Sequence, residues 1–199
     1  MRIAFLFFCL LCFATNVHAQ FEINKYNRER LTINKKGMYV LGGWAAGNII
    51  WGAVSVGSAT GSNRYFHQMN LGWGIINGAL AGMNILQLHK QIAKSKGLSF
   101  AGTIKEQQKL ERLFLINAGL DVAYLGTGIW MKERSRTAAK KPERLKGFGN
   151  SLLLQGGFLL LFDGIMFSVH HAHGKPLINH LENLQVTAGL NGTGISIYF

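Results

Sequence analysis

The sequence predicts an all-α fold: an integral membrane bundle of four transmembrane helices, arranged as two antiparallel hairpins, with a short C-terminal β-hairpin tail. Three observations lead to this prediction. Hydrophobic residues make up 48% of the 199 positions, and charged residues make up only 15%. Glycine is abundant (25 residues) and proline is scarce (2 residues), a balance that is typical of membrane helices. Four apolar windows of about 20 residues, each long enough to cross a bilayer, cover residues 38–57, 66–87, 110–130 and 148–168.

Residues 1–19 are interpreted as a cleavable signal peptide. Arg2 supplies a positive start, residues 3–13 form an apolar run, and residues 17–19 fit a small-residue cleavage site. The apolar run is too short to span a bilayer comfortably, which favours cleavage over retention as an anchor. Both cysteines, Cys9 and Cys12, lie in this segment. The mature chain would therefore have no disulfide, thiolate nucleophile or cysteine metal site.

Residues 20–178 are expected to form the transmembrane domain. A turn rich in Gly, Ser and Asn, residues 58–65, joins the first two windows into an antiparallel hairpin. A longer polar connection, residues 88–109, leads to the third window, and a strongly basic loop, residues 132–147, joins the third to the fourth. The alternative is a soluble four-helix bundle, which needs a charged face on every helix. None of the four windows has such a face, and this favours the membrane interpretation.

Each window carries an amide or a carboxyl group near its middle. These residues are Asn48, Asn77, Asn117 with Asp121, and Gln155. Because lipid cannot satisfy such groups, we expect them to face one another as a polar layer across the centre of the bundle. Two interpretations stay open. The layer either holds the helices in register through hydrogen bonds, or binds a polar solute or ion with Asp121 as the titrating group.

The second window combines a ridge of small residues with a line of amides. Gly74, Gly78 and Gly82 recur every four residues, a spacing that lets another helix backbone approach closely. The asparagines of the same window are spaced by seven: Asn70, Asn77 and Asn84. The ridge is therefore a candidate helix-packing surface.

A second candidate site lies where the second and fourth windows end, on the side expected to be exterior. Its members are His89, Asp163, His170, His171 and His173. Neighbouring neutral imidazoles are ligands for a metal ion or haem, but histidines at a helix end are also common as solvated, interfacial groups. We expect no cofactor, with haem or metal as the alternative. The chain has no Ser-His-Asp pattern, no phosphate-binding glycine loop and no HExxH motif, so the sequence leans against an enzyme without deciding the matter.

The C-terminal segment, residues 179–199, differs from the rest of the chain. From residue 184 its apolar residues alternate as in a strand, and Asn191-Gly192 is a hairpin turn signal. We therefore expect a short extramembrane β-hairpin.

The net charge of +12 predicts affinity for the anionic headgroups of a lipid bilayer, and no nucleic-acid-binding pattern accompanies it. The expected location is the bacterial inner membrane, with the mature N-terminus on the periplasmic side. The basic loop at residues 132–147 would then face the cytoplasm, as the positive-inside rule prefers. Lysines and arginines at residues 25–36 and 90–109 would lie on the other side, so the orientation depends on the signal peptide.

Taken together, the signal peptide, the Leu41-Gly-Gly-Trp44-x3-Asn48 motif and the asparagine-lined second window resemble an uncharacterised family of four-helix bacterial envelope membrane proteins. That family has no assigned activity, so the resemblance implies no site. The leading hypothesis is a non-enzymatic scaffold or assembly factor of the bacterial envelope, acting as a homo-oligomer or with an envelope protein partner. The alternatives are a small transporter or channel subunit that uses the central polar layer, and a haem- or metal-binding membrane protein.

Overall fold

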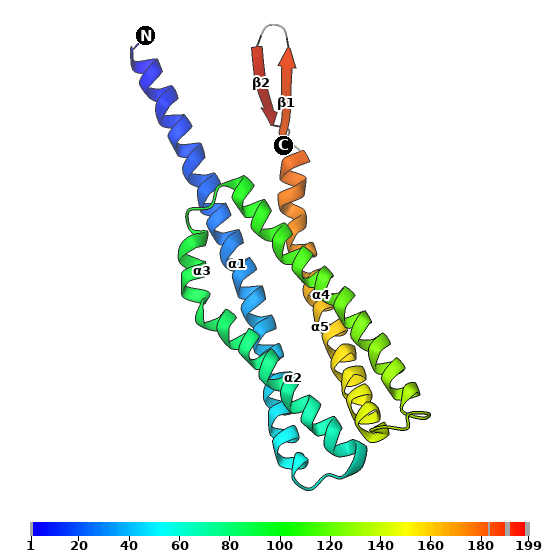
Figure 1. Cartoon of the computed structure of the whole chain (residues 1–199). Helices are drawn as coiled ribbons and strands as arrows, with labels where there is room; N and C mark the ends of the chain where they lie inside the picture. The colour runs from blue at the N-terminus through cyan, green and yellow to red at the C-terminus, as the bar shows by residue number, and fades with distance from the viewer. Residues whose placement is uncertain (1, 183, 190–191, 198–199) are drawn as a thin grey trace.

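The computed structural model describes the backbone of residues 2–182, 184–189 and 192–197, and the side chains of residues 23–179. Apart from short connections, the first of these ranges is helical. Its five helices are α1 (Arg2–Val56), α2 (Gly61–Leu86), α3 (Leu88–Ser95), α4 (Phe100–Arg134) and α5 (Pro142–Glu182). Helix α1 packs mainly along α2, and α4 packs along α5 (Figure 1). The contact between α2 and α5 joins these two pairs.

Two short strands follow α5. β1 (Leu184–Gly189) and β2 (Gly192–Ile197) pair antiparallel, with Leu184 opposite Ile197 and Gly189 opposite Gly192. Asn191 of the expected turn lies outside the described residues, and so do the side chains of the tail. The docking role expected for the tail stays a prediction.

The helices extend well beyond the apolar windows. Helix α4 begins at Phe100 instead of residue 110, and the connection expected at residues 88–109 contains the whole of α3. Local sequence explains these starts. The Ser99 hydroxyl caps α4 by accepting from the Gly102 amide at 3.2 Å, and Pro142 occupies the first position of α5, where its missing N–H costs nothing. The extended ends carry charged residues and add polar contacts outside the apolar windows.

Among the described residues, three helical segments are long and apolar enough to cross a membrane: Ile23–Val56, Phe100–Arg134 and Pro142–Asn179. This corrects the prediction of four spans, because α2 is not among them. Amides explain the difference. Asn70, Asn77 and Asn84 all fall within α2, and each lowers its mean hydropathy. Helix α2 instead lies against both α1 and α5.

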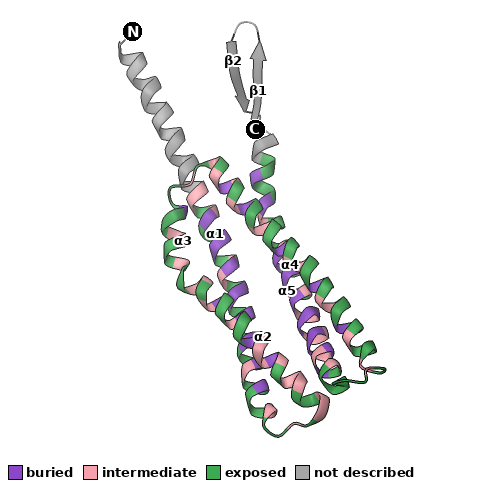
Figure 2. Ribbon diagram, in the orientation of Figure 1, coloured by how far each residue is buried: buried purple, intermediate pink, exposed green. Residues whose placement is uncertain are grey.

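Polar side chains are concentrated inside the protein and large apolar side chains outside it, the reverse of the distribution in a water-soluble protein. Over the described residues, buried polar and charged side chains outnumber buried hydrophobic ones, and the buried positions lie mainly along the inward faces of the helices (Figure 2). Large hydrophobic side chains cover the outside: Leu86 is 80% exposed, Val54 76% and Leu161 69%. A protein folded in water shows the opposite preference, because apolar burial drives its folding.

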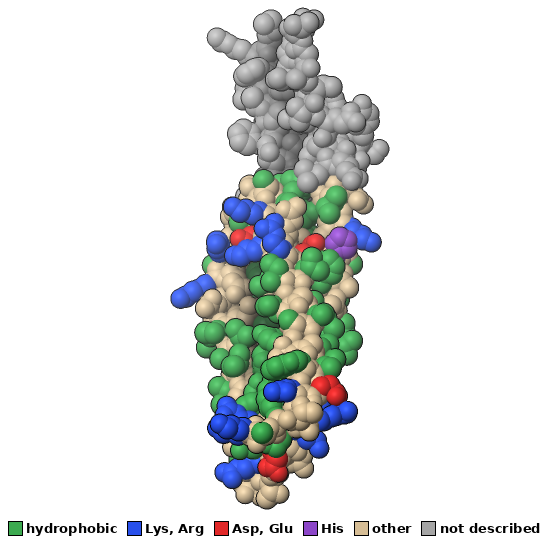
Figure 3. All heavy atoms as spheres, turned by 45° about the vertical axis from the view of Figure 1, so that its right-hand side comes forward, with side chains coloured by type: hydrophobic (Ala, Val, Ile, Leu, Met, Phe, Trp, Pro, Cys, Tyr) green, Lys and Arg blue, Asp and Glu red, His purple; other side chains and the backbone are tan. Residues whose placement is uncertain are grey.

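Charged side chains gather near both ends of the helices and leave an apolar band between them (Figure 3). On α4 the band extends from Arg112 to Lys132, and Asp121 is the only ionisable carboxyl or basic group between them. At 1.5 Å per residue this stretch is about 28 Å long, close to the roughly 30 Å of a bilayer's hydrocarbon core. The three long apolar helices therefore suggest a membrane protein.

Candidate functional site

A buried hydrogen-bond network joins α1, α2 and α5. Its centre is the Gln155 side chain of α5, which is completely buried. Its amide nitrogen donates to the Oδ1 atoms of Asn48 on α1 at 2.7 Å and Asn70 on α2 at 3.0 Å. Its Oε1 atom accepts from the indole nitrogen of Trp44 at 2.9 Å. One side chain thus contacts polar groups on two other helices.

Neighbouring residues complete the network. The Ser151 hydroxyl, one turn before Gln155 on the same face of α5, donates to Asn70 Oδ1 at 2.6 Å. On α1, Asn48 Nδ2 donates to the Trp44 carbonyl at 2.8 Å. The Trp44 ring also stacks on Phe158, with centroids 3.9 Å apart and planes 6° from parallel. Residues four apart share a helix face, so Trp44 and Asn48, like Ser151 and Gln155, act as pairs.

The structure brings together only part of the expected polar layer. Asn48 and Gln155 meet, whereas the buried Asn77 lies outside the network and its Nδ2 atom has no hydrogen-bond partner among the described residues. Asn70, completely buried, takes its place. The spacing of the asparagines in α2 was the signal that could have identified Asn70.

Asp121, another residue of the predicted layer, instead forms an acidic pair with Asp163 between α4 and α5. Asp121 and Asp163 are 2% and 4% exposed, and their carboxyl groups lie within hydrogen-bonding reach of each other. The Asn117 side chain also lies close to the Asp163 carboxyl group. Asp163 therefore lies beside Asp121 and not with the histidines, where the sequence had placed it. The cause is close packing: a Cβ on Gly156 would lie 3.2 Å from the Asp121 carbonyl, so the two helices nearly touch here.

The four candidate histidines do not converge on one centre. His171 pairs with Glu111 of α4 at 3.2 Å, and His173 stacks on Tyr26 of α1 with ring centroids 4.2 Å apart. His170 is buried against Phe114, and His89 is exposed on α3. No group of three or more His, Cys, Asp or Glu side chains in the described part of the chain could hold a metal ion.

The expected glycine ridge contacts α1 through two of its three members. A Cβ on Gly74 would lie 2.8 Å from the Ile49 side chain and 2.9 Å from the Ala45 carbonyl, so only glycine allows this approach. A Cβ on Gly78 would make an ordinary contact with Ala45 at 3.6 Å, and one on Gly82 would meet nothing within 4 Å.

A second set of buried polar contacts lies near the other end of α1, and Asn84 is its only member inside an apolar window. Asn27 donates to the Thr103 hydroxyl at 2.9 Å and accepts from Arg30 at 3.0 Å, while Asn34 donates to Asn84 at 3.1 Å. The sequence prediction missed the members outside the windows because it searched only within them, and it assigned no partner to Asn84.

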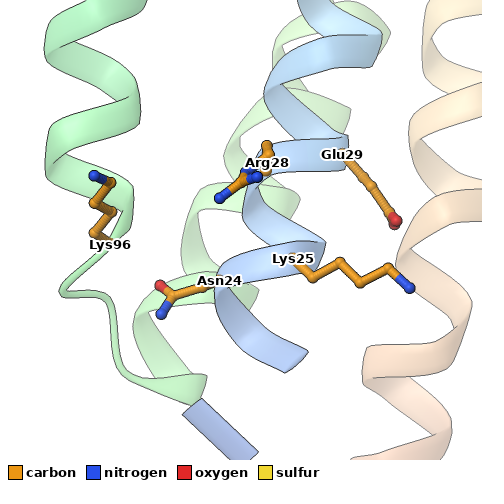
Figure 4. A pocket seen from close by; sticks show the side chains of 5 residues that line it. All are labelled: Asn24, Lys25, Arg28, Glu29 and Lys96. Atoms are coloured by element: carbon orange, nitrogen blue, oxygen red, sulfur yellow. The ribbon is translucent and has the colours of Figure 1, made fainter. Parts of the chain in front are cut away.

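A hollow of about 490 Å³ lies at the same end. Its lining residues are Asn24, Lys25, Arg28, Glu29 and Lys96 (Figure 4). Lys25 and Glu29 extend away from the side where Lys96 lies, so the lining groups do not converge on a common point.

Comparison with known proteins identifies a family. A family model described as a family of unknown function (DUF6992) matches residues 40–164, which include the hydrogen-bond network and the acidic pair. No curated protein and no solved structure matches the chain. The expectation of an uncharacterised family is confirmed, although the family description says nothing of a membrane or an envelope.

Proposed function

The chain belongs to the DUF6992 family of unknown function, and from its geometry we propose an integral protein of the bacterial inner membrane that acts as a non-enzymatic scaffold or assembly factor. The observation that carries this proposal is the reversed distribution of side chains. Large hydrophobic residues face outward while amides, hydroxyls and carboxyls face inward. An apolar surrounding makes that arrangement favourable, because a polar side chain that faces inward can hydrogen-bond to another helix, whereas lipid offers it no partner.

The hydrogen bonds that the central amides make within the protein favour a scaffold over a transporter. Gln155, Asn48, Asn70 and Ser151 hydrogen-bond to one another, and the acceptor atom of Gln155 is taken by Trp44. A solute site would need several of these groups free to exchange partners, whereas within the described part of the chain only the Nδ2 atom of Asn70 is without one among these four side chains. Hydrogen bonds of this kind hold helices in a fixed register, each contributing about 0.6 kcal/mol.

A scaffold needs a surface for its partner, and α1 offers one. Gly43 and Gly47 are exposed, and a Cβ on either would meet nothing within 4 Å. They lie on the same face as the exposed Val40 and Ile50. Small residues four apart let a second helix approach closely within a bilayer. The proposed partner surface is therefore this face of α1, facing a second copy or an envelope protein.

The substitution Gly47→Leu tests this surface. It should shift the protein, extracted in mild detergent and sized by native mass spectrometry, from a complex to the monomer. Its thermal unfolding should be unchanged, because the new side chain has no neighbour inside the chain. Gly126→Leu is the matched control, since its site on α4 is equally open. A complex that survives Gly47→Leu, or that breaks equally with Gly126→Leu, would exclude the α1 face.

The acidic pair favours a second candidate function, proton-coupled transport. A hydrogen bond between two carboxyl groups needs a proton on one of them, and Asp121 and Asp163 are held together inside the chain at mid-depth of the apolar band. If the pair carries protons, Asp121→Asn should abolish proton-driven uptake or proton leak in proteoliposomes. Glu133→Gln, at an exposed position in the last turn of α4, should leave either unchanged. Proton movement that persists with Asp121→Asn would exclude this function for the pair.

The proposed orientation puts both the N-terminus and the start of α4 on the periplasmic side, because α2 runs back along α1 and returns the chain to that end of the molecule (Figure 1). The loop between α4 and α5 then faces the cytoplasm. A fluorescent reporter that folds only in the cytoplasm should be active when inserted after Ala138 of this loop, and a periplasmic phosphatase inserted there should be inactive. The opposite pattern would reverse the orientation without affecting membrane insertion.

A further inference from the structure

A hollow of about 560 Å³ opens between α1, α3 and α4, a size within the range of small-molecule sites. It is distinct from the hydrogen-bond network and from the acidic pair. Five basic side chains line it: Arg30, Lys90, Lys94, Lys109 and Arg112. Glu106 is the only acidic residue in its lining. The wall is therefore strongly positive.

Arg30 distinguishes this hollow from an ordinary basic surface. Its side chain is only 3% exposed and yet lines the hollow. One guanidinium nitrogen donates to Asn27 at 3.0 Å, and Glu106 interacts with the guanidinium electrostatically. The Nε atom has no hydrogen-bond partner among the described residues. A buried donor without a partner destabilises the fold, and an anionic ligand would supply that partner.

The hollow also has an apolar wall on one side. Leu110, Leu113 and Ile116 of α4 line it, and the last two continue into the apolar band with 50% and 56% of their surfaces exposed. The basic side chains come from the charged end of the molecule. The hollow thus lies at the boundary between the charged end and the apolar band.

We propose that this hollow binds an anionic phospholipid, with the phosphate held by Arg30, Lys109 and Arg112 and an acyl chain lying along Leu113 and Ile116. This inference rests on the membrane placement proposed above. Guanidinium groups are suited to phosphate because several of their N–H donors can contact its oxygens at once. Free phosphate shares that chemistry, but it would leave the apolar wall uncovered.

Competitive lipid binding tests the site. Full-length protein in mild detergent is mixed with equal amounts of phosphatidylglycerol and phosphatidylcholine, and the retained lipids are identified by native mass spectrometry. The wild type should retain one phosphatidylglycerol in preference to phosphatidylcholine. The double substitution Lys109→Gln, Arg112→Gln should weaken that preference roughly tenfold, because each basic group near a headgroup adds appreciable attraction. Both residues are exposed, so the fold should persist.

The double substitution Lys132→Gln, Arg134→Gln is the matched control. It removes the same charge at the opposite end of α4 and should leave the preference unchanged. Equal loss in the control, or no preference in the wild type, would overturn the site. Inorganic phosphate that displaces the lipid at equal concentration would show that the apolar wall plays no part, and would overturn the lipid assignment.

If the protein partitions into water without detergent, the membrane proposal itself fails. If it stays in the membrane without lipid preference, only the site fails.

Discussion

Gln155 determines how three helices meet, because its two amide hydrogens and its oxygen all have partners on α1 and α2. Those partners are Trp44, Asn48 and Asn70. We therefore expect stability to depend on this single side chain more than on any exposed glutamine.

The substitution Gln155→Leu should lower the free energy of unfolding by about 2 kcal/mol, the sum of three interhelical hydrogen bonds at roughly 0.6 kcal/mol each. The substitution removes the hydrogen bonds that Gln155 makes to the Trp44 indole N–H and to the side-chain Oδ1 atom of Asn48. Far-UV circular dichroism during unfolding in mixed detergent and dodecyl sulfate micelles would measure the loss. Gln108→Leu, at an exposed position of α4, should have almost no effect. Equal stability of Gln155→Leu and wild type would contradict a role for the network.

At this scale the sequence predicts which residues are polar and buried, but not which of them meet. The meeting of Asn48 and Gln155 could be predicted, since both lie near the middle of apolar windows. The pairing of Asp163 with Asp121 could not. It depends on how far α5 slides along α4, and close glycine contacts fix that offset: a Cβ on Gly128 would lie 2.9 Å from the Gly149 carbonyl.

At the scale of elements, α2 shows how one helix combines two kinds of contact. Gly74 lies directly against the backbone of α1, while Gly82 on the same helix is open. Of the three glycines in the predicted ridge, Gly74 and Gly78 thus lie close to α1, and Gly82 does not. Neither spacing nor composition separates them, because at that turn Ala81 faces α1 and Gly82 does not: a Cβ on Gly42 would lie 3.7 Å from the Ala81 Cβ.

Two alanine substitutions in α2 test this contact. Gly74→Ala should lower the melting temperature in detergent, because its Cβ would lie within 2.9 Å of Ile49 and Ala45 and force the helices apart. Gly82→Ala should leave the temperature unchanged or raise it, since alanine favours a helix by up to about 1 kcal/mol over glycine. If both substitutions act alike, the close approach of α1 and α2 is wrong.

The apolar windows predict the approximate position of each long helix but underestimate its length. Residues 88–95 and 100–109 are polar enough to resemble a linker, yet they form α3 and the start of α4. Their helical structure comes from capping at Ser99 and from tertiary contacts such as the one between Asn27 and Thr103. Hydropathy does not report such contacts.

At the scale of the whole molecule, the reversed distribution of side chains and the two charged ends have the same explanation. The outer surface of the helices is suited to hydrocarbon over about 28 Å. The chain's overall composition already indicates this environment. The basic hollow at one end could not be predicted, because its lining comes from residues far apart in the sequence, such as Arg30 and Arg112. Both the scaffold and the lipid site depend on this placement in a bilayer.

The most direct measurement of that placement is the accessibility of a spin label at residue 120. In a Cys9→Ser, Cys12→Ser background, Leu120→Cys carries the label at an exposed position beside the buried Asp121, and Lys140→Cys carries it in the loop between α4 and α5. In reconstituted liposomes, the label at residue 120 should collide more often with oxygen, which dissolves in lipid, than with a water-soluble nickel chelate. The label at residue 140 should show the reverse. A label at residue 120 that the nickel chelate reaches as readily as residue 140 would mean that water, not lipid, surrounds these helices.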